Sequence, residues 1–82
     1  MWFFPPAGIL AAMNIPELFA SRLRSEMSRR GVRLSDLAGE LGVSVNSVSN
    51  WRRGRALPTI PRLVEIADQL DVTTDWLLGL EP

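Results

Sequence analysis

The stretch LSDLAGELGVSVNSVSNW, residues 34–51, decides the fold. Its first half carries apolar side chains at the spacing of one helix face, and these are Leu34, Leu37, Ala38 and Leu41. Gly42 ends this helix, and Ser44 is a preferred cap for a next helix that runs from Val45 to about Arg53. Only residues 42–44 separate the two, a link typical of a helix-turn-helix, in which two helices meet at a steep angle.

A longer helix precedes this pair. Asn14 is a good N-cap and Glu17 stands three residues later, as in a capping box. Apolar residues then recur every fourth position, and Gly31 ends the helix. The apolar stripe consists of Ile15, Phe19, Leu23 and Met27.

Two more helices follow. Thr59 caps the fourth, which ends at Asp71, and Thr73 or Thr74 caps a short fifth helix that Gly79 ends. Their predicted buried residues are Leu63, Ile66, Ala67 and Leu70, then Trp76, Leu77 and Leu78. No segment alternates with a period of two, so we expect no strand. The prediction is an all-α fold, a compact five-helix bundle over residues 14–80, with residues 81–82 as the C-terminal end.

The charges are strongly segregated along the chain. All nine arginines lie between Arg22 and Arg62 with only three acidic residues among them, so this segment carries a net charge of +6. Residues 63–82 contain five acidic residues and no basic one, a net charge of −5, and Glu17 brings the total to zero. This polarity favours an anionic partner on one face, although an uneven, merely solvated surface is the alternative.

Composition excludes most chemistry. The chain of 82 residues has room for one domain and lacks His, Cys, Tyr and Lys. We therefore expect no metal site, no cofactor and no catalytic residue, since the main zinc ligands and the commonest bases and nucleophiles are missing. There is also no Gly-x-Ser-x-Gly elbow and no glycine-rich phosphate loop with Lys, so the chain is predicted not to be an enzyme.

Residues 1–13, MWFFPPAGILAAM, carry no charged side chain. They lack the basic start of a secretory signal and are too short to span a bilayer, so we expect a cytoplasmic protein without a membrane partner. Three interpretations remain: an extended tail, an apolar arm that packs on the domain or on a second subunit, or an over-long start with translation beginning at Met13.

Residues 15–79 resemble the Cro/repressor-type helix-turn-helix domain, also called the lambda-repressor-like or XRE family. The resemblance rests on the run LSDLAGELGVSVNSVSNWRRGRALPTIPRLVEIADQLDVTTDWLLG and covers about four-fifths of the chain. It implies a sequence-specific regulator of transcription that binds double-stranded DNA. The second and third helices would form the helix-turn-helix, with residues 45–53 as the recognition helix in the major groove. A homodimer would bind a palindromic operator, with half-sites about 34 Å apart.

The geometry of the third helix can be worked out separately. If Val48 points inward, Asn46 and Asn50 lie about 160° away, on the outer face. Asn can bond adenine, Ser can bond either partner of a base pair, and Val can touch a thymine methyl group. The predicted base-contacting residues are Val45, Asn46, Ser49 and Asn50.

The resemblance also places residues beside the phosphate backbone. The predicted phosphate contacts are Arg33, Ser44, Ser47, Arg53 and Arg55. Relatives often have Ser or Thr capping the second helix, followed by Gln, where this chain has Arg33 and Leu34. Backbone amides at the start of that helix can still bind phosphate.

Arg52 departs from the family pattern. Relatives often carry Glu there, paired with an Arg of the first helix, a position that Arg22 fills here. Two arginines cannot pair, which leaves Glu17, Glu26 or a phosphate as the partner of Arg52.

A second function class uses the same fold. An antitoxin or adaptor would bind a protein partner such as a toxin.

Self-association into the homodimer would use the N-terminal arm or the fifth helix, through Trp76, Leu77 and Leu80. Trp51 and Trp76 are both predicted to lie in the core and not to stack on nucleic-acid bases.

Overall fold

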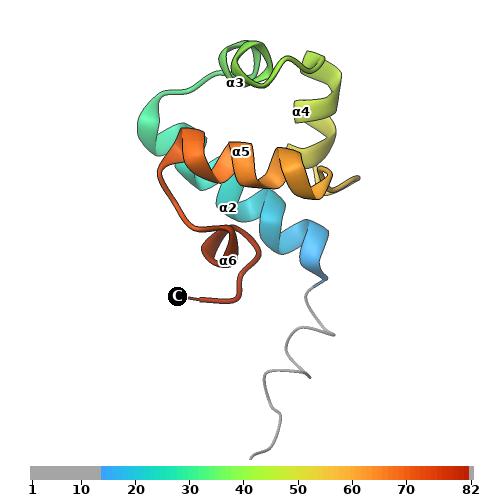
Figure 1. Cartoon of the computed structure of the whole chain (residues 1–82). Coiled ribbons are helices and arrows are strands. Elements are labelled where there is room, and N and C mark those ends of the chain that lie inside the picture. The colour runs from blue at the N-terminus through green and yellow to red at the C-terminus, as the bar shows by residue number, and fades with distance from the viewer. Residues whose placement is uncertain (1–13, 82) are drawn as a thin grey trace, which may run out of the picture.

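The computed structural model describes residues 14–81, which form five helices and no strand, as predicted (Figure 1). The helices are α2 (Ile15–Arg30), α3 (Leu34–Leu41), α4 (Val45–Arg52), α5 (Ile60–Leu70) and α6 (Thr74–Leu77). The predicted N-terminal arm, residues 1–13, and Pro82 lie outside the described residues.

Four of the five helices begin with a side-chain cap at the predicted position. Asn14 accepts a hydrogen bond from the backbone N–H of Glu17 at 3.0 Å, and Ser44, Thr59 and Thr73 make the equivalent bond to the third residue after them. Thr73, and not Thr74, therefore caps the last helix. Each cap satisfies one N–H that the helix itself leaves without a partner.

Residues in the left-handed conformation end α2, α3 and α5. Gly42, with φ of 69°, ends α3 and turns the chain into α4 after only two more residues. Asp71 takes the same role after α5 with φ of 55°, and it is the only residue other than glycine with positive φ among the described residues. The short polar side chain of Asp tolerates this conformation.

Every helix contributes to one core. Phe19, Leu23, Val48, Ile66 and Leu77 are fully buried, at 0% exposure, and Trp51 is 6% exposed. In Figure 1, α3 and α4 lie at one end of the molecule and α6 at the other, with α2 and α5 between them. The helix-turn-helix is therefore held on a rigid support and not on a loop.

Some residues at the ends of the predicted apolar stripes are less buried than expected. Ile15 begins α2, one turn before Phe19, and is 38% exposed, because the stripe runs past the region that other helices cover. Leu63 is only half-buried. The fifth helix ends at Leu77, one residue earlier than expected. Trp76 is also half-buried, with the Arg22 guanidinium 4.5 Å from its ring centroid, so it packs at the margin of the core.

Glu26 is a buried carboxylate that the sequence pattern did not single out. It is 6% exposed and accepts hydrogen bonds from Arg29 at 2.8 Å and 3.2 Å and from Arg30 at 3.0 Å. The hydrogen bonds from Arg29 hold the pKa of Glu26 below the ordinary 4.5, despite a burial that acts in the opposite direction. Glu26 therefore stays ionised, and its carboxylate pairs with two arginine side chains from the last turn of the same helix.

This arrangement predicts a loss of stability in acid. A carboxylate with a lowered pKa stabilises the fold fully above its ordinary pKa of 4.5, and the contribution disappears as pH falls through the folded value. We expect Glu26→Gln to lower the free energy of unfolding at pH 7 by about 1 kcal/mol, since both arginines are partly solvated. Urea unfolding at pH 7 and pH 3 checks this. The difference between variant and parent should shrink in acid, and an equal difference at both pH values would contradict it.

Candidate nucleic-acid interface

The outer face of α4 carries the four predicted base-contacting side chains. Val45 is 47% exposed and Asn46 is exposed, while Ser49 and Asn50 are half-buried. Val48 and Trp51 on the opposite face are buried, as helical spacing predicts, but Asn50 is less exposed than its predicted place beside Asn46 implies. The face offers an amide pair, a hydroxyl and a methyl-bearing side chain, which are the groups that read base edges in the major groove.

Ser44 and Ser47 lie together at the start of α4. Ser44 Oγ accepts a hydrogen bond from the Ser47 N–H at 3.1 Å, and the two hydroxyl oxygens are 3.0 Å apart. Both side chains thus stand beside the N-terminus of α4, where the helix dipole favours an anion. This is a suitable place for the phosphate contact predicted for them.

Arg33 stands just before α3 and is exposed. Its backbone N–H donates to Asp36 Oδ2 at 3.0 Å, and its Nε lies 3.4 Å from the same oxygen. The hydrogen bond from the Arg33 N–H holds the pKa of Asp36 below its ordinary value. Asp36 thus bonds the backbone N–H that precedes α3 but does not replace the missing Ser or Thr cap, which would accept from the first turn of the helix. Asp36 also partly neutralises Arg33, which weakens the case for Arg33 as a phosphate contact.

A groove of about 470 Å³ lies beside the outer face of α4. Its lining residues come from three helices and from the loop after α4: Arg24, Leu34, Ser49, Arg52, Arg53 and Arg55. We call it the arginine groove. It brings together Arg53, Arg55 and Ser49 from the predicted site and adds Arg24 and Arg52, which had not been assigned to it.

The remaining five arginines have other partners. Arg29 and Arg30 bind Glu26, Arg33 binds Asp36, and Arg22 lies over Trp76. Arg62 donates to Leu41 O at 2.8 Å and pairs with Glu65 at 2.8 Å. No ion pair among residues 14–81 involves any of the four arginines of the groove. The excess positive charge of the basic segment is therefore concentrated there.

The two acidic partners considered for Arg52 are both excluded. Glu26 is occupied by Arg29 and Arg30, and no ion pair within the described range joins Glu17 to an arginine. Arg22 does not face Arg52 either, because the Arg22 guanidinium lies over the ring of Trp76. The residue of α2 that contacts Arg52 is Arg24, which donates a hydrogen bond to its backbone oxygen. The Nε of Arg52 is buried and has no hydrogen-bond partner.

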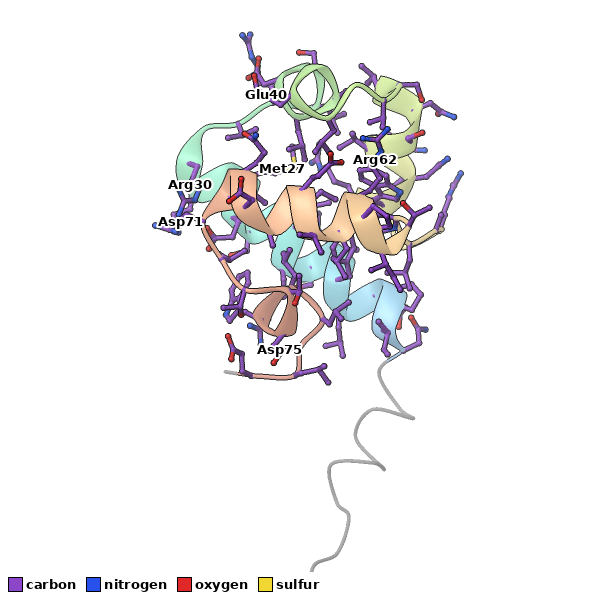
Figure 2. The ribbon with its side chains drawn as sticks, in the orientation of Figure 1. Met27, Arg30, Glu40, Arg62, Asp71 and Asp75 are labelled. Carbon is purple, nitrogen blue, oxygen red and sulfur yellow. The ribbon has the colours of Figure 1, made fainter. Side chains whose placement is uncertain are left out.

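Acidic side chains gather mostly away from this end of the molecule. Figure 2 shows Asp75 on α6, opposite α3 and α4, and Asp71 at the far end of α5. Glu40, labelled in Figure 2, and Asp36 are exceptions, since both belong to α3, at the same end as α4. The segregation of charge along the sequence is thus only partly a polarity in space, since Arg30 is labelled beside Asp71 in Figure 2.

One residue expected to mediate self-association is not available for it. Leu77 is fully buried, because α6 packs on α2 and α5 with this side chain inward. Leu80, at 55% exposure, remains on the surface, and Ile60 and Val64 of α5 are exposed as well, at 77% and 54%. No helix among residues 14–81 is long and apolar enough to cross a membrane.

Comparison with known proteins supports the interpretation of these elements. The model of a helix-turn-helix family matches residues 23–77. The chain is 34% identical over 67 residues to the cryptic phage CTXphi transcriptional repressor RstR of Vibrio cholerae serotype O1, covering 82% of this chain and 56% of that protein. It is 39% identical over 62 residues to the HTH-type transcriptional regulator PrtR of Pseudomonas aeruginosa, covering 76% of this chain and 24% of that protein.

A third relative is the HTH-type transcriptional regulator DdrOP3 of Deinococcus deserti, 39% identical over 61 residues, with 73% of this chain and 47% of that protein covered. The chain therefore spans about a quarter to just over half of the length of these three relatives. No solved structure matches it significantly.

Proposed function

This chain belongs to the helix-turn-helix family of the Cro/repressor type, and from that premise we propose that it is a sequence-specific, double-stranded DNA-binding regulator of transcription and not an enzyme. The relatives above are named as transcriptional regulators, one of them as a repressor, which supports regulation as the role. Because a family fold does not by itself determine function, the proposal depends on the side chains of α4.

The outer face of α4 is the observation that carries the proposal. In this arrangement α4 enters the major groove, and Val45, Asn46, Ser49 and Asn50 meet base edges. Asn46 and Asn50 are suited to adenine, whose N6 and N7 one amide can bind together. The neighbouring Ser44 and Ser47 hydroxyls would meet the phosphate backbone, which fixes the position of the helix without reading sequence.

We place two such domains on a palindromic operator. A single module of this size buries only about 600–1,000 Å² of protein surface on DNA, so one copy alone binds weakly. A homodimer with recognition helices about 34 Å apart would read two half-sites on one side of the duplex. In this proposal the protein acts in the cytoplasm, where operator DNA is accessible.

Selection of bound sequences from a random duplex library, at a stated salt concentration, tests the function. Enrichment of a palindrome would support DNA readout and dimeric symmetry together. Enrichment of a single half-site would keep DNA readout and remove the dimer. If no sequence is enriched, a protein partner such as a toxin becomes the better explanation of the fold, and the regulator proposal fails.

The arginines after α4 give a separate prediction. We expect Arg53→Ala and Arg55→Ala each to weaken binding to all duplex sequences alike, because their charges meet phosphates and not bases. Each should lower the slope of log affinity against log salt by about one unit. Fluorescence anisotropy from 50 mM to 200 mM salt measures this slope. An unchanged slope would remove the residue from the phosphate contacts.

A further inference from the structure

We propose that the arginine groove is a phosphate-binding site in which Arg24 of α2 and Arg52 of α4 hold a phosphate group together with Arg53 and Arg55. Within the proposed function, on which this identification of the ligand rests, the phosphate belongs to the DNA backbone beside the major groove. The first helix of the domain then takes part directly in DNA binding, in addition to supporting α4.

The first argument is electrostatic. Four guanidinium groups line one groove of about 470 Å³, and no carboxylate is among the lining residues. Glu26, the acid nearest in sequence to Arg24, does not compensate it, since Glu26 is bound to Arg29 and Arg30. Like charges held close together destabilise a fold unless an anion lies between them. Four of the other five arginines pair with a carboxylate and Arg22 lies over Trp76, so the groove holds the four arginines that have neither an acidic nor an aromatic partner among residues 14–81.

The second argument is the placement of donors. Arg24 Nη1 donates to Arg52 O at 2.6 Å, which fixes its guanidinium at the C-terminal end of α4. A guanidinium has five N–H groups, so this single bond leaves others for a ligand. The buried Nε of Arg52 has no partner, and leaving such a donor unbonded is costly. Because this Nε is closed off from solvent, a phosphate in the groove would bind the terminal N–H groups of Arg52 and would reach the Nε only after a shift of the side chain.

The third argument is the position of the groove relative to the reading face. Ser49 lines the groove from α4, and Leu34, the first residue of α3, lines it from the other helix of the pair. The groove thus lies beside the start of α3, where the dipole favours an anion and the Asp36 carboxylate offsets part of that attraction. The groove has more room than one phosphate group needs, which suits a passing sugar-phosphate chain.

A titration with inorganic phosphate tests the site without DNA. The Nε–H signals of the arginines are followed by NMR in the unaltered protein. We expect saturable shifts at Arg24 and Arg52, with Arg22 and Arg62 unmoved because they lie outside the groove. Small shifts of similar size at all nine arginines would overturn the site, since they would report only diffuse attraction.

Duplex binding tests the source of the phosphate. We expect Arg24→Gln to lower the salt slope by about one unit and to weaken binding to every sequence, as one lost phosphate contact would. Arg22→Gln is the matched control, because it removes the same charge from the same helix, two residues away, outside the groove. Arg24→Lys keeps the charge without the forked donors and should restore the slope but only part of the affinity. Circular dichroism confirms that each variant is folded.

The two arms separate the possible failures. If phosphate shifts Arg24 and Arg52 but no duplex is bound, the site stands with a free phosphate as its ligand, and the regulator proposal fails. If the duplex is bound and Arg24→Gln behaves like Arg22→Gln, DNA binding stands and the backbone is not the ligand of the groove. If phosphate leaves both arginines unmoved, the groove is not a phosphate site.

Discussion

Trp51→Ala is expected to unfold much of the protein at room temperature. Trp51 is 6% exposed and lies on the inner face of α4, which packs against both α2 and α3. Truncating a buried aromatic residue to alanine costs about 3–5 kcal/mol, through lost burial and the cavity left behind. Small domains have a total stability near the low end of about 5–15 kcal/mol, so this one change can consume most of it.

Urea unfolding followed by circular dichroism measures the loss. Ile60→Ala is a suitable control, because Ile60 is 77% exposed on α5 and its truncation should change stability by at most about 0.5 kcal/mol. DNA binding by the Trp51 variant should weaken on specific and random duplexes alike. A stable Trp51 variant would mean that α4 is held in place by other contacts than those of its inner face.

Asn46→Ala and Asn50→Ala are each expected to cost about 1–3 kcal/mol of binding energy on the enriched site. Each would remove one amide that is suited to bonding an adenine. The loss should concentrate on the operator and spare random duplex, so that the preference for one base pair disappears at the position each side chain reads. Affinity for a panel of operators with single base changes, measured at one salt concentration, shows which base pair that is.

The exposed amide of Gln69 provides the control for this pair. Gln69 lies on α5, outside the helix-turn-helix, so Gln69→Ala should leave both affinity and base preference unchanged. Equal losses on operator and random duplex for Asn46→Ala or Asn50→Ala would mean that the side chain contacts the backbone or supports the fold. Direct base reading by that residue would then be ruled out.

Local features of the chain predicted the helix boundaries well. The caps at Asn14, Ser44 and Thr59 act on N–H groups only three residues away, so their effect does not depend on the rest of the fold. Asp71 was likewise expected to end the fourth helix, and it does so in a left-handed conformation. The orientation of α4 followed from helical spacing alone once Val48 was taken as inward.

Features that depend on how helices meet were not predictable in the same way. Arg24 is exposed and stands outside the apolar stripe of α2, so nothing nearby in sequence connects it with Arg52, 28 residues later. Arg62 was counted with the basic segment, but its side chain extends from α5 and donates a hydrogen bond to the backbone oxygen of Leu41, the last residue of α3. Ile15 followed the helical period and is nevertheless exposed. Periodicity predicts the direction in which a side chain points, but it does not predict whether another helix packs over that side chain.

The eight-residue length of α4 makes folding and recognition inseparable. Isolated helices shorter than about 12–15 residues are marginal in water, so α4 exists as a helix only while Val48 and Trp51 hold it on the bundle. A peptide covering α4 alone would spend most of its time unfolded, and its apparent affinity would fall by that fraction. Under the proposed function, operator DNA would in turn act as a stabilising ligand of the folded chain, and the melting temperature would become a measure of occupancy.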